Sequence, residues 1–191
     1  VLISVKAYID HEPIDEPLLP ALLHAASVGN TEMVRLLLDN GADTEISDWA
    51  GRKALGYALE NRQIEVLKLL IAAGADVNSR EASRDTLLML SVKREDIVAA
   101  ELLIHARACL DERNDDAKTA IMLASERGNI GLVNLLITAK AELEISDVNG
   151  YTALTLAVIN AHGPVVHAPL RAGANANARN LRRYVPPLAS T

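Results

Sequence analysis

The sequence predicts an all-α solenoid made of stacked helix–turn–helix–hairpin units of 33 residues. Three observations lead to this fold class: a phrase that recurs along the chain, a helical spacing of apolar residues inside each copy, and a core composition with few aromatic rings. The phrase MVRLLLDNGADTEI, from Met33 to Ile46, returns as VLKLLIAAGADVNS from Val66 to Ser79. Half of the residues are hydrophobic, yet only 3% are aromatic and none is Phe. A core of small and aliphatic side chains favours closely stacked helices.

A step of 33 residues connects equivalent positions through five copies without an insertion. One apolar register consists of Leu22, Leu55, Leu88, Ile121 and Leu154. A small-residue register consists of Ala42, Ala75, Ala108, Ala141 and Ala174. A unit of this size cannot bury its apolar face alone, so neighbouring units must stack to supply the missing partner.

The second copy shows the order of elements within a unit. Residues 53–61 predict a first helix because their apolar side chains fall on one helical face. Residues 64–74 predict a second helix that ends at Gly74, a residue suited to the left-handed conformation after a helix. Its predicted inward residues are Val66, Leu67, Leu69, Leu70 and Ile71. The polar segment 75–85 then predicts a hairpin.

We therefore expect five full repeats flanked by two partial ones. The full repeats are expected at 18–47, 48–80, 81–113, 114–146 and 147–179. The partial repeats are expected at 1–17, as the remnant of a preceding N-terminal unit, and at 180–191. Because the chain lacks an initial Met and both ends fall inside a unit, we expect it to be a piece of a longer protein.

Two stretches carry a resemblance to a known family. DWAGRKALGYALENRQIEVLKLLIAAGADVN at 48–78 and DVNGYTALTLAVINA at 147–161 resemble the ankyrin-repeat pattern, which the chain follows over most of its length. The resemblance implies a solenoid whose hairpin tips and exposed first-helix faces form a concave strip. It also implies a non-catalytic module for protein–protein interaction, although the fold alone does not identify a partner.

Four turns depart from the family's pattern. The glycine of the hairpin is replaced by Arg84 and Ala117 in the third and fourth copies. The glycine that ends the second helix is replaced by Arg107 and Lys140 in the same copies. A left-handed conformation costs a residue other than glycine roughly 1 kcal/mol. We therefore expect altered or looser turns in these two copies.

The fifth copy has a proline inside its predicted second helix. Pro169 occupies the position of Leu37 and Leu70, where a proline costs about 3 kcal/mol through its missing N–H and its ring. Ala168 also replaces the Leu of the other copies. We expect a kinked or prematurely ended second helix, and hence a degenerate repeat at 147–179.

Composition and motifs exclude several classes of function. The net charge of −6 and the pI of about 5.4 argue against a nucleic-acid partner, and no apolar run is long enough for membrane insertion. The single cysteine, Cys109, fits a reducing compartment, so we expect a cytoplasmic or nuclear location. We also expect the chain to be a monomer. No nucleophile elbow, phosphate-binding loop or zinc spacing occurs, and we expect no catalytic residue, no cofactor and no metal. His162 and His167 are poorly spaced to share a metal on one helical face.

The predicted binding residues lie on the concave strip that the resemblance implies. Trp49 is the foremost candidate, because the only Trp falls at a hairpin tip and interface hot spots are enriched in Trp. Positions that vary between copies, or that make the middle copies basic, complete the set: Arg52, Arg80, Asp85, Lys93, Arg94, Lys118, Arg127 and Tyr151. An acidic peptide could dock on the basic members, and an ordinary solvated face would show the same charges.

Two functions remain open at this point. In the first, the chain binds another protein or a peptide segment through the concave strip. In the second, it is a regulatory or targeting ankyrin domain of a larger enzyme or channel and packs against its own chain.

Overall fold

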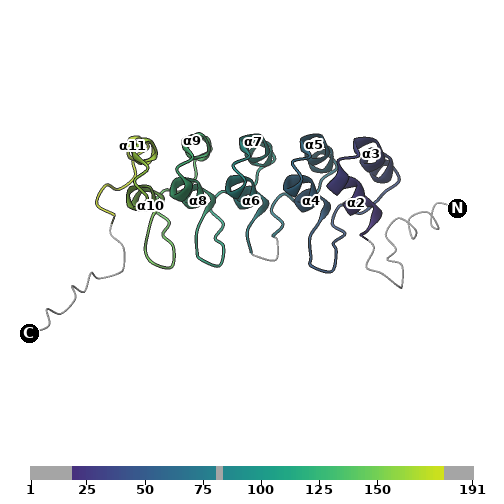
Figure 1. Ribbon diagram of the computed structural model, residues 1–191, viewed down its shortest axis with the longest axis horizontal. Coiled ribbons are helices and arrows are strands. Elements are labelled where there is room, and N and C mark those ends of the chain that lie inside the picture. Colours follow the sequence, from purple (N-terminus) through teal and green to yellow (C-terminus); the bar gives the residue numbers. More distant parts are fainter. Residues whose placement is uncertain (1–18, 81–83, 179–191) are drawn as a thin grey trace, which may run out of the picture. The chain divides into compact units, whose positions relative to one another are not determined.

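The computed structural model describes residues 19–80 and 84–178 (Figure 1). Within these ranges it contains ten α-helices, arranged as five pairs. The first helices of the pairs are α2 (Ala21–Val28), α4 (Ala54–Glu60), α6 (Leu87–Lys93), α8 (Ala120–Arg127) and α10 (Ala153–Ile159). The second helices are α3 (Thr31–Asp39), α5 (Ile64–Ala72), α7 (Ile97–His105), α9 (Ile130–Thr138) and α11 (Gly163–Arg171). The predicted partial repeats at 1–17 and 180–191 lie outside the described residues.

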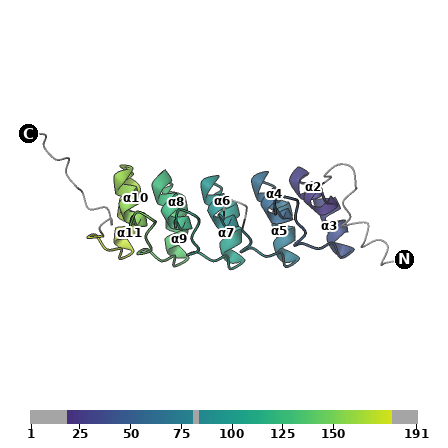
Figure 2. The ribbon, with the colours of Figure 1, turned by 90° about the horizontal axis from the view of Figure 1, so that it is seen from below.

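The helices belong to two compact units that meet between Cys109 and Leu110. In the first unit α4 packs between α2 and α6, and α5 packs between α3 and α7. Within this unit the first helices thus form one layer and the second helices form the other, with the hairpins extending from the side of the first helices (Figure 1, Figure 2). In the second unit α8 packs on α10, and α9 packs on α11.

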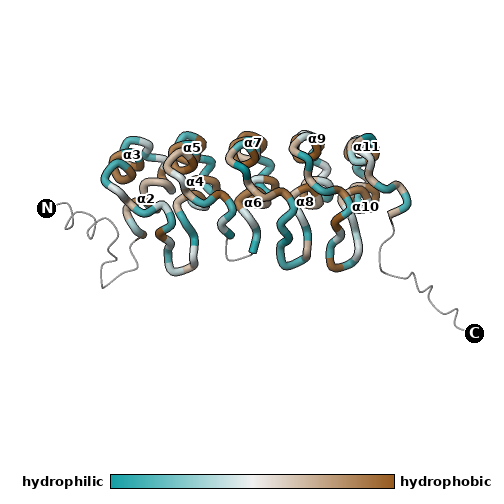
Figure 3. The backbone as a smooth tube through the Cα atoms, turned by 180° about the vertical axis from the view of Figure 1, so that it is seen from behind, coloured by the Kyte–Doolittle hydropathy of each residue, from teal (hydrophilic) through white to brown (hydrophobic). Residues whose placement is uncertain are grey.

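The core follows the 33-residue register. Each helix pair buries aliphatic side chains between the two layers, while the hairpins are mostly hydrophilic (Figure 3). On the second helices the fully buried register is Val34, Leu67, Ala100 and Val133 together with Leu70, Leu103 and Leu136. Leu69 and Ile71 are only half-buried, so the expectation that both point inward was too broad. Their positions lie at the edge of the apolar stripe, where a neighbouring helix covers them in part.

The turns at Arg107, Ala117 and Lys140 keep the left-handed backbone of the glycine turns, so the expectation that they are altered was wrong. The hairpin of Arg84 includes residues 81–83, which lie outside the described residues. Arg107 and Lys140 have φ angles of 65° and 72°, in the same left-handed region as Gly74. The N–H of Arg107 donates to Ile104 O at 2.9 Å, as the N–H of Gly74 donates to Ile71 O at 3.0 Å. Arg84 and Ala117 likewise adopt left-handed φ angles of 56° and 57°. The surrounding hydrogen bonds and packing therefore hold these residues in a strained conformation.

Pro169 does not end its helix early, so this part of the expectation about the fifth copy was wrong. Helix α11 runs over nine residues, the same length as α9. Pro169 is buried, and its carbonyl accepts the closing hydrogen bond from the N–H of Ala174 at 2.9 Å. A proline in the last turn removes only the hydrogen bond to Val165 O, so the rest of the helix still forms.

Candidate functional site

The hairpin between α3 and α4 presents Trp49 to solvent. Its side chain is 81% exposed, the largest exposed hydrophobic residue among those the structure describes. The turn beneath it is held by the buried Asp48, whose Oδ1 accepts hydrogen bonds from the N–H groups of Ala50 at 2.9 Å and Arg52 at 2.8 Å. The turn is therefore built by Asp48 and the backbone, without help from the Trp49 side chain.

A polar cluster connects this hairpin to α4. Tyr57 Oη donates to Asp48 Oδ2 at 2.8 Å, and Arg52 Nε donates to the same oxygen at 2.9 Å. The Arg52 guanidinium lies 4.5 Å from the centre of the Tyr57 ring, a cation–π distance. Because the cluster joins two elements through a buried carboxylate, it rigidifies the base of the hairpin.

The same contacts shift two pKa values. Burial and the hydrogen bond to Asp48 raise the pKa of Tyr57 to about 12. Burial alone would raise the pKa of Asp48, but hydrogen bonds from the Arg52 N–H, the Tyr57 hydroxyl and the Arg52 side chain outweigh it and lower that pKa. Asp48 is thus an ionised carboxylate that accepts hydrogen bonds from Ala50, Arg52 and Tyr57.

Ion pairs occupy two equivalent positions in successive repeats, which we call the pair positions. The first lies two residues before the first helix, and the second lies eight residues later. In the third repeat Lys93 Nζ lies 2.6 Å from Asp85 Oδ2, and in the fourth Lys118 Nζ lies 2.7 Å from Glu126 Oε1. In the second repeat Arg52 Nη1 lies 3.6 Å from Glu60 Oε2. Four of the predicted binding residues, Arg52, Asp85, Lys93 and Lys118, are therefore already paired within their own repeats.

Asp85 differs from its predicted place on the open strip. Its side chain is only 3% exposed, so Lys93 and not Asp85 faces solvent at this pair. The neighbouring Lys93 cation explains the difference, because burying an unpaired carboxylate would carry a large desolvation penalty.

Arg94 joins the ends of two first helices in the first unit. Its Nη1 donates to Glu60 O at 3.0 Å, its Nη2 lies 3.6 Å from Glu60 Oε1, and its own carbonyl accepts from Arg62 Nη2 at 3.0 Å. Glu60 therefore lies between Arg52 and Arg94 and brings two predicted residues together. Neither Glu60 nor Arg62 was predicted as part of the site.

Arg80 and Tyr151 lie in hairpins, and Arg127 lies at the end of α8. Arg80 Nη1 donates to Arg84 O at 3.0 Å across its own hairpin. Tyr151 is half-buried, and its backbone N–H donates to Asp147 Oδ1 at 2.9 Å. Arg127 is exposed. The structure thus places Arg80 in a structural role within its turn.

The second unit has an exposed apolar group that sequence reasoning missed. Val148 is 63% exposed at a hairpin tip, and Val158 and Ile159 are 56% and 57% exposed at the end of α10. Tyr151 and Ile159 occupy the two pair positions of the fifth repeat. A comparison of the pair positions between copies would have found this group, because only the first and fifth copies lack a charge at both positions, and the first has Ser27 where the fifth has Ile159.

A comparison with protein-family models decides what these repeated units are. The model described as ankyrin repeats (3 copies) matches residues 4–81 and 84–180. The chain belongs to the ankyrin-repeat family. A comparison with curated proteins found no match. Ankyrin repeats are generally modules for protein–protein interaction and are typically non-catalytic.

No group of three His, Cys, Asp or Glu side chains in the described ranges could hold a metal ion. Within the same ranges, every helix is too short or too polar to cross a membrane. His162 has a packing role: its Nε2 lies 3.0 Å from Glu126 O, and its ring fills the space where a Cβ on Gly128 would be.

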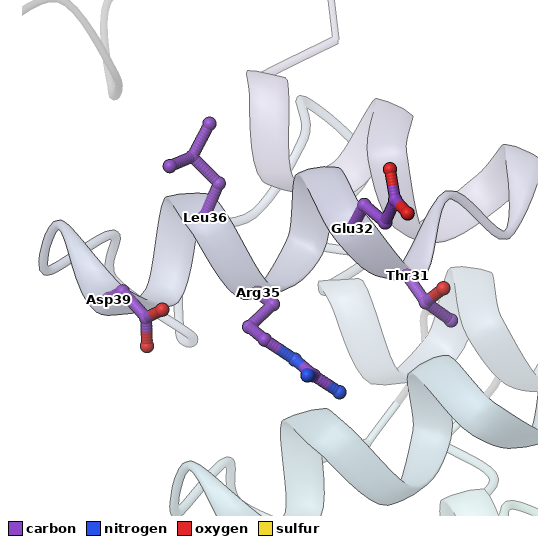
Figure 4. A pocket seen from close by; sticks show the side chains of 5 residues that line it. All are labelled: Thr31, Glu32, Arg35, Leu36 and Asp39. Carbon is purple, nitrogen blue, oxygen red and sulfur yellow. The ribbon is translucent and has the colours of Figure 1, made fainter.

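A shallow concavity lies on α3 of the first ankyrin repeat (Figure 4). It is lined by Thr31, Glu32, Arg35, Leu36 and Asp39. Leu36 points away from Arg35 and is 57% exposed, whereas its counterparts Leu69 and Leu102 are half-buried. This face of α3 combines one exposed apolar side chain with charged ones and is separate from the hairpin tips.

Proposed function

We propose that this chain is a non-catalytic module that binds another protein or a peptide segment through its hairpin tips and the exposed ends of its first helices. The observation that carries the proposal is the exposure of Trp49 on a hairpin fixed by Asp48. Exposing a Trp forgoes hydrophobic stabilisation, and the turn does not need it. A large, pre-positioned aromatic side chain is a common anchor of protein interfaces.

The charged residues around Trp49 suit the rim of such an interface. Arg52, Glu60 and Arg94 alternate in sign along the first unit and hold one another in place. Charges arranged in this way set the orientation and specificity of a partner more than its affinity. We expect the module to act as a monomer in the cytoplasm or nucleus, with no nucleic-acid partner.

A second function is favoured by a different surface. Val28, Met33 and Leu36 expose apolar side chains on the side of α2 and α3. A regulatory or targeting ankyrin domain that packs against other parts of a longer chain would cover such a face. In that case the partner of this module would be its own parent protein.

A capture experiment separates the two functions. The chain and two variants, Trp49→Ala and Val98→Ala, are immobilised and exposed to cell lysate, and the bound proteins are identified by mass spectrometry. Val98 is an exposed apolar residue of α7 and serves as the matched control. Proteins lost from Trp49→Ala but retained by Val98→Ala support binding through the hairpin tip. Capture of the same proteins by all three chains contradicts it, and capture of none supports the second function.

A further inference from the structure

The pair positions divide the repeats of the second unit into two kinds. In the fourth repeat Lys118 and Glu126 neutralise each other, with nitrogen–oxygen distances of 2.7 and 2.9 Å. In the fifth repeat the same two positions hold Tyr151 and Ile159, which cannot form an ion pair. The two positions therefore carry an ion pair in the fourth repeat and uncharged side chains in the fifth.

The apolar surface of the fifth repeat extends beyond the two pair positions. Val148 lies at the tip of the same hairpin as Tyr151. Val158 is exposed for another reason, because its counterparts Leu59 and Val92 are buried where the following repeat packs. More than half of Val148 and more than half of Ile159 is exposed. An apolar cluster with a polar surround is typical of a protein-binding site.

An exposed cation lies in the repeat that precedes this cluster. Arg127 is exposed at the end of α8, and in the part of the chain that the structure describes no hydrogen bond or ion pair engages its guanidinium. The neighbouring carbonyl of Glu126 lies 3.0 Å from His162 Nε2, just beyond α10, so Arg127 is next to the fifth repeat. A carboxylate of a partner would be complementary to this charge.

The distance between the axes of α8 and α10 favours a helical partner over an extended one. Helices α8 and α10 pack side by side, which puts their axes about 8–10 Å apart. Two turns of an α-helix, seven residues, rise about 10.5 Å and return to the same face. An extended strand covers that distance in about three residues, but its first and fourth side chains then point to opposite faces.

We propose that the second unit binds an amphipathic helical segment of a partner protein, with apolar side chains over Tyr151 and Ile159 and an Asp or Glu seven residues away against Arg127. This inference rests on the proposed function and names the chemistry of the partner. It places the main apolar contact of the second unit in the fifth repeat, where Tyr151 was the only residue predicted to bind a partner.

The test begins with a displayed library of helical peptides of about 14 residues, or four turns, selected on the full chain. Bound peptides are then titrated by fluorescence anisotropy against four variants. The central variant, Tyr151→Lys with Ile159→Glu, installs the charge pair of the fourth repeat and closes the apolar strip. Ile159→Lys, which copies Lys93, replaces it if the double variant does not unfold cooperatively. Trp49→Ala and Arg127→Glu complete the set.

We expect selected peptides to contain apolar residues and a carboxylate seven positions apart. Their affinity should fall at least about thirtyfold with the installed charge pair, as expected for loss of an interface anchor. It should fall about tenfold with Arg127→Glu and recover when the peptide carboxylate is replaced by Lys.

Three results would overturn the inference. The first is that selected peptides lack this spacing. The second is that the variant with the installed pair binds them as tightly as the wild type. The third is that the selection yields no peptide. Peptides that depend on Trp49 but not on Ile159 would refute this inference while leaving the proposed function intact. The lysate experiment decides that function separately.

Discussion

Asn78 Oδ1 accepts a hydrogen bond of 2.7 Å from the backbone N–H of Cys109, which lies 31 residues further along the chain. The same bond recurs between repeats with other acceptors. Glu45 accepts from the N–H of Asp76 at 2.9 Å, Asp111 from Glu142 at 2.8 Å, and Glu144 from Asn175 at 2.8 Å. A carboxylate or amide at this position therefore connects the start of each hairpin to the start of the next one, within each unit.

Removal of this bond should weaken the first unit. Asn78→Ala leaves the N–H of Cys109 without its acceptor and should lower the free energy of unfolding by about 1 kcal/mol. Asn78→Asp keeps an acceptor, as Asp111 does in the same register, and should stay close to the wild type. Urea unfolding followed by circular dichroism measures both. An equal loss in the two variants would show that the amide group, and not the accepted bond, matters.

The buried ion pair of the third repeat should be sensitive to loss and tolerant of exchange. Lys93→Met removes the cation beside the Asp85 carboxylate, which is 3% exposed, and should cost about 3 kcal/mol. Asp85→Lys combined with Lys93→Glu copies the polarity of Lys118 and Glu126 and should cost less. Thermal unfolding compares the variants. If the double variant were less stable than Lys93→Met, the expectation that the ion pair can be reversed would be wrong.

Stability should fall at high pH because of Tyr57. Its pKa is raised from 10.0 to about 12, so the folded state holds the phenolic proton more tightly than the unfolded chain. This contribution is complete below pH 10 and is lost as the pH rises toward 12. Tyrosinate absorbance should show a late component that is absent in Tyr57→Phe. Simultaneous titration of all tyrosines well before the chain unfolds would refute the protection of Tyr57.

The left-handed turns of the middle repeats should carry measurable strain. Arg107→Gly and Arg107→Ala both remove the guanidinium, but only the glycine relieves the conformation at a φ of 65°. The glycine variant should be more stable than the alanine variant by about 1 kcal/mol. Differential scanning calorimetry resolves such a difference. Equal stabilities would mean that the turn is unstrained with a side chain present.

The proline in α11 should lower the stability of the last repeat. Pro169→Leu restores the N–H that can donate to Val165 O, and it introduces the residue that Leu37 and Leu136 provide in the same register. We expect a higher melting temperature, with up to about 3 kcal/mol of added stability. No gain, or a loss, would show that the packing of this repeat was built around the proline ring.

The sequence by itself determined the repeats and their helices. Every predicted copy contains a helix pair in register, because the 33-residue period and the apolar face of each helix are local properties of the chain. It also placed Trp49 at a hairpin tip, because the following Gly51 marks the turn and an unpatterned aromatic residue is visible in the sequence. Four of the other predicted binding residues, Arg52, Asp85, Lys93 and Lys118, are paired within their own repeats, which the sequence did not show.

Only the tertiary structure decided how charges and turns are used. Arg107 and Lys140 keep the glycine-type turn because neighbouring hydrogen bonds outweigh a local preference of about 1 kcal/mol. Asp85 is buried because Lys93, eight residues away, neutralises it. The bond from Cys109 to Asn78 forms because stacking brings adjacent hairpins together. Each of these outcomes depends on contacts between separate elements, and local propensity carries no information about such contacts.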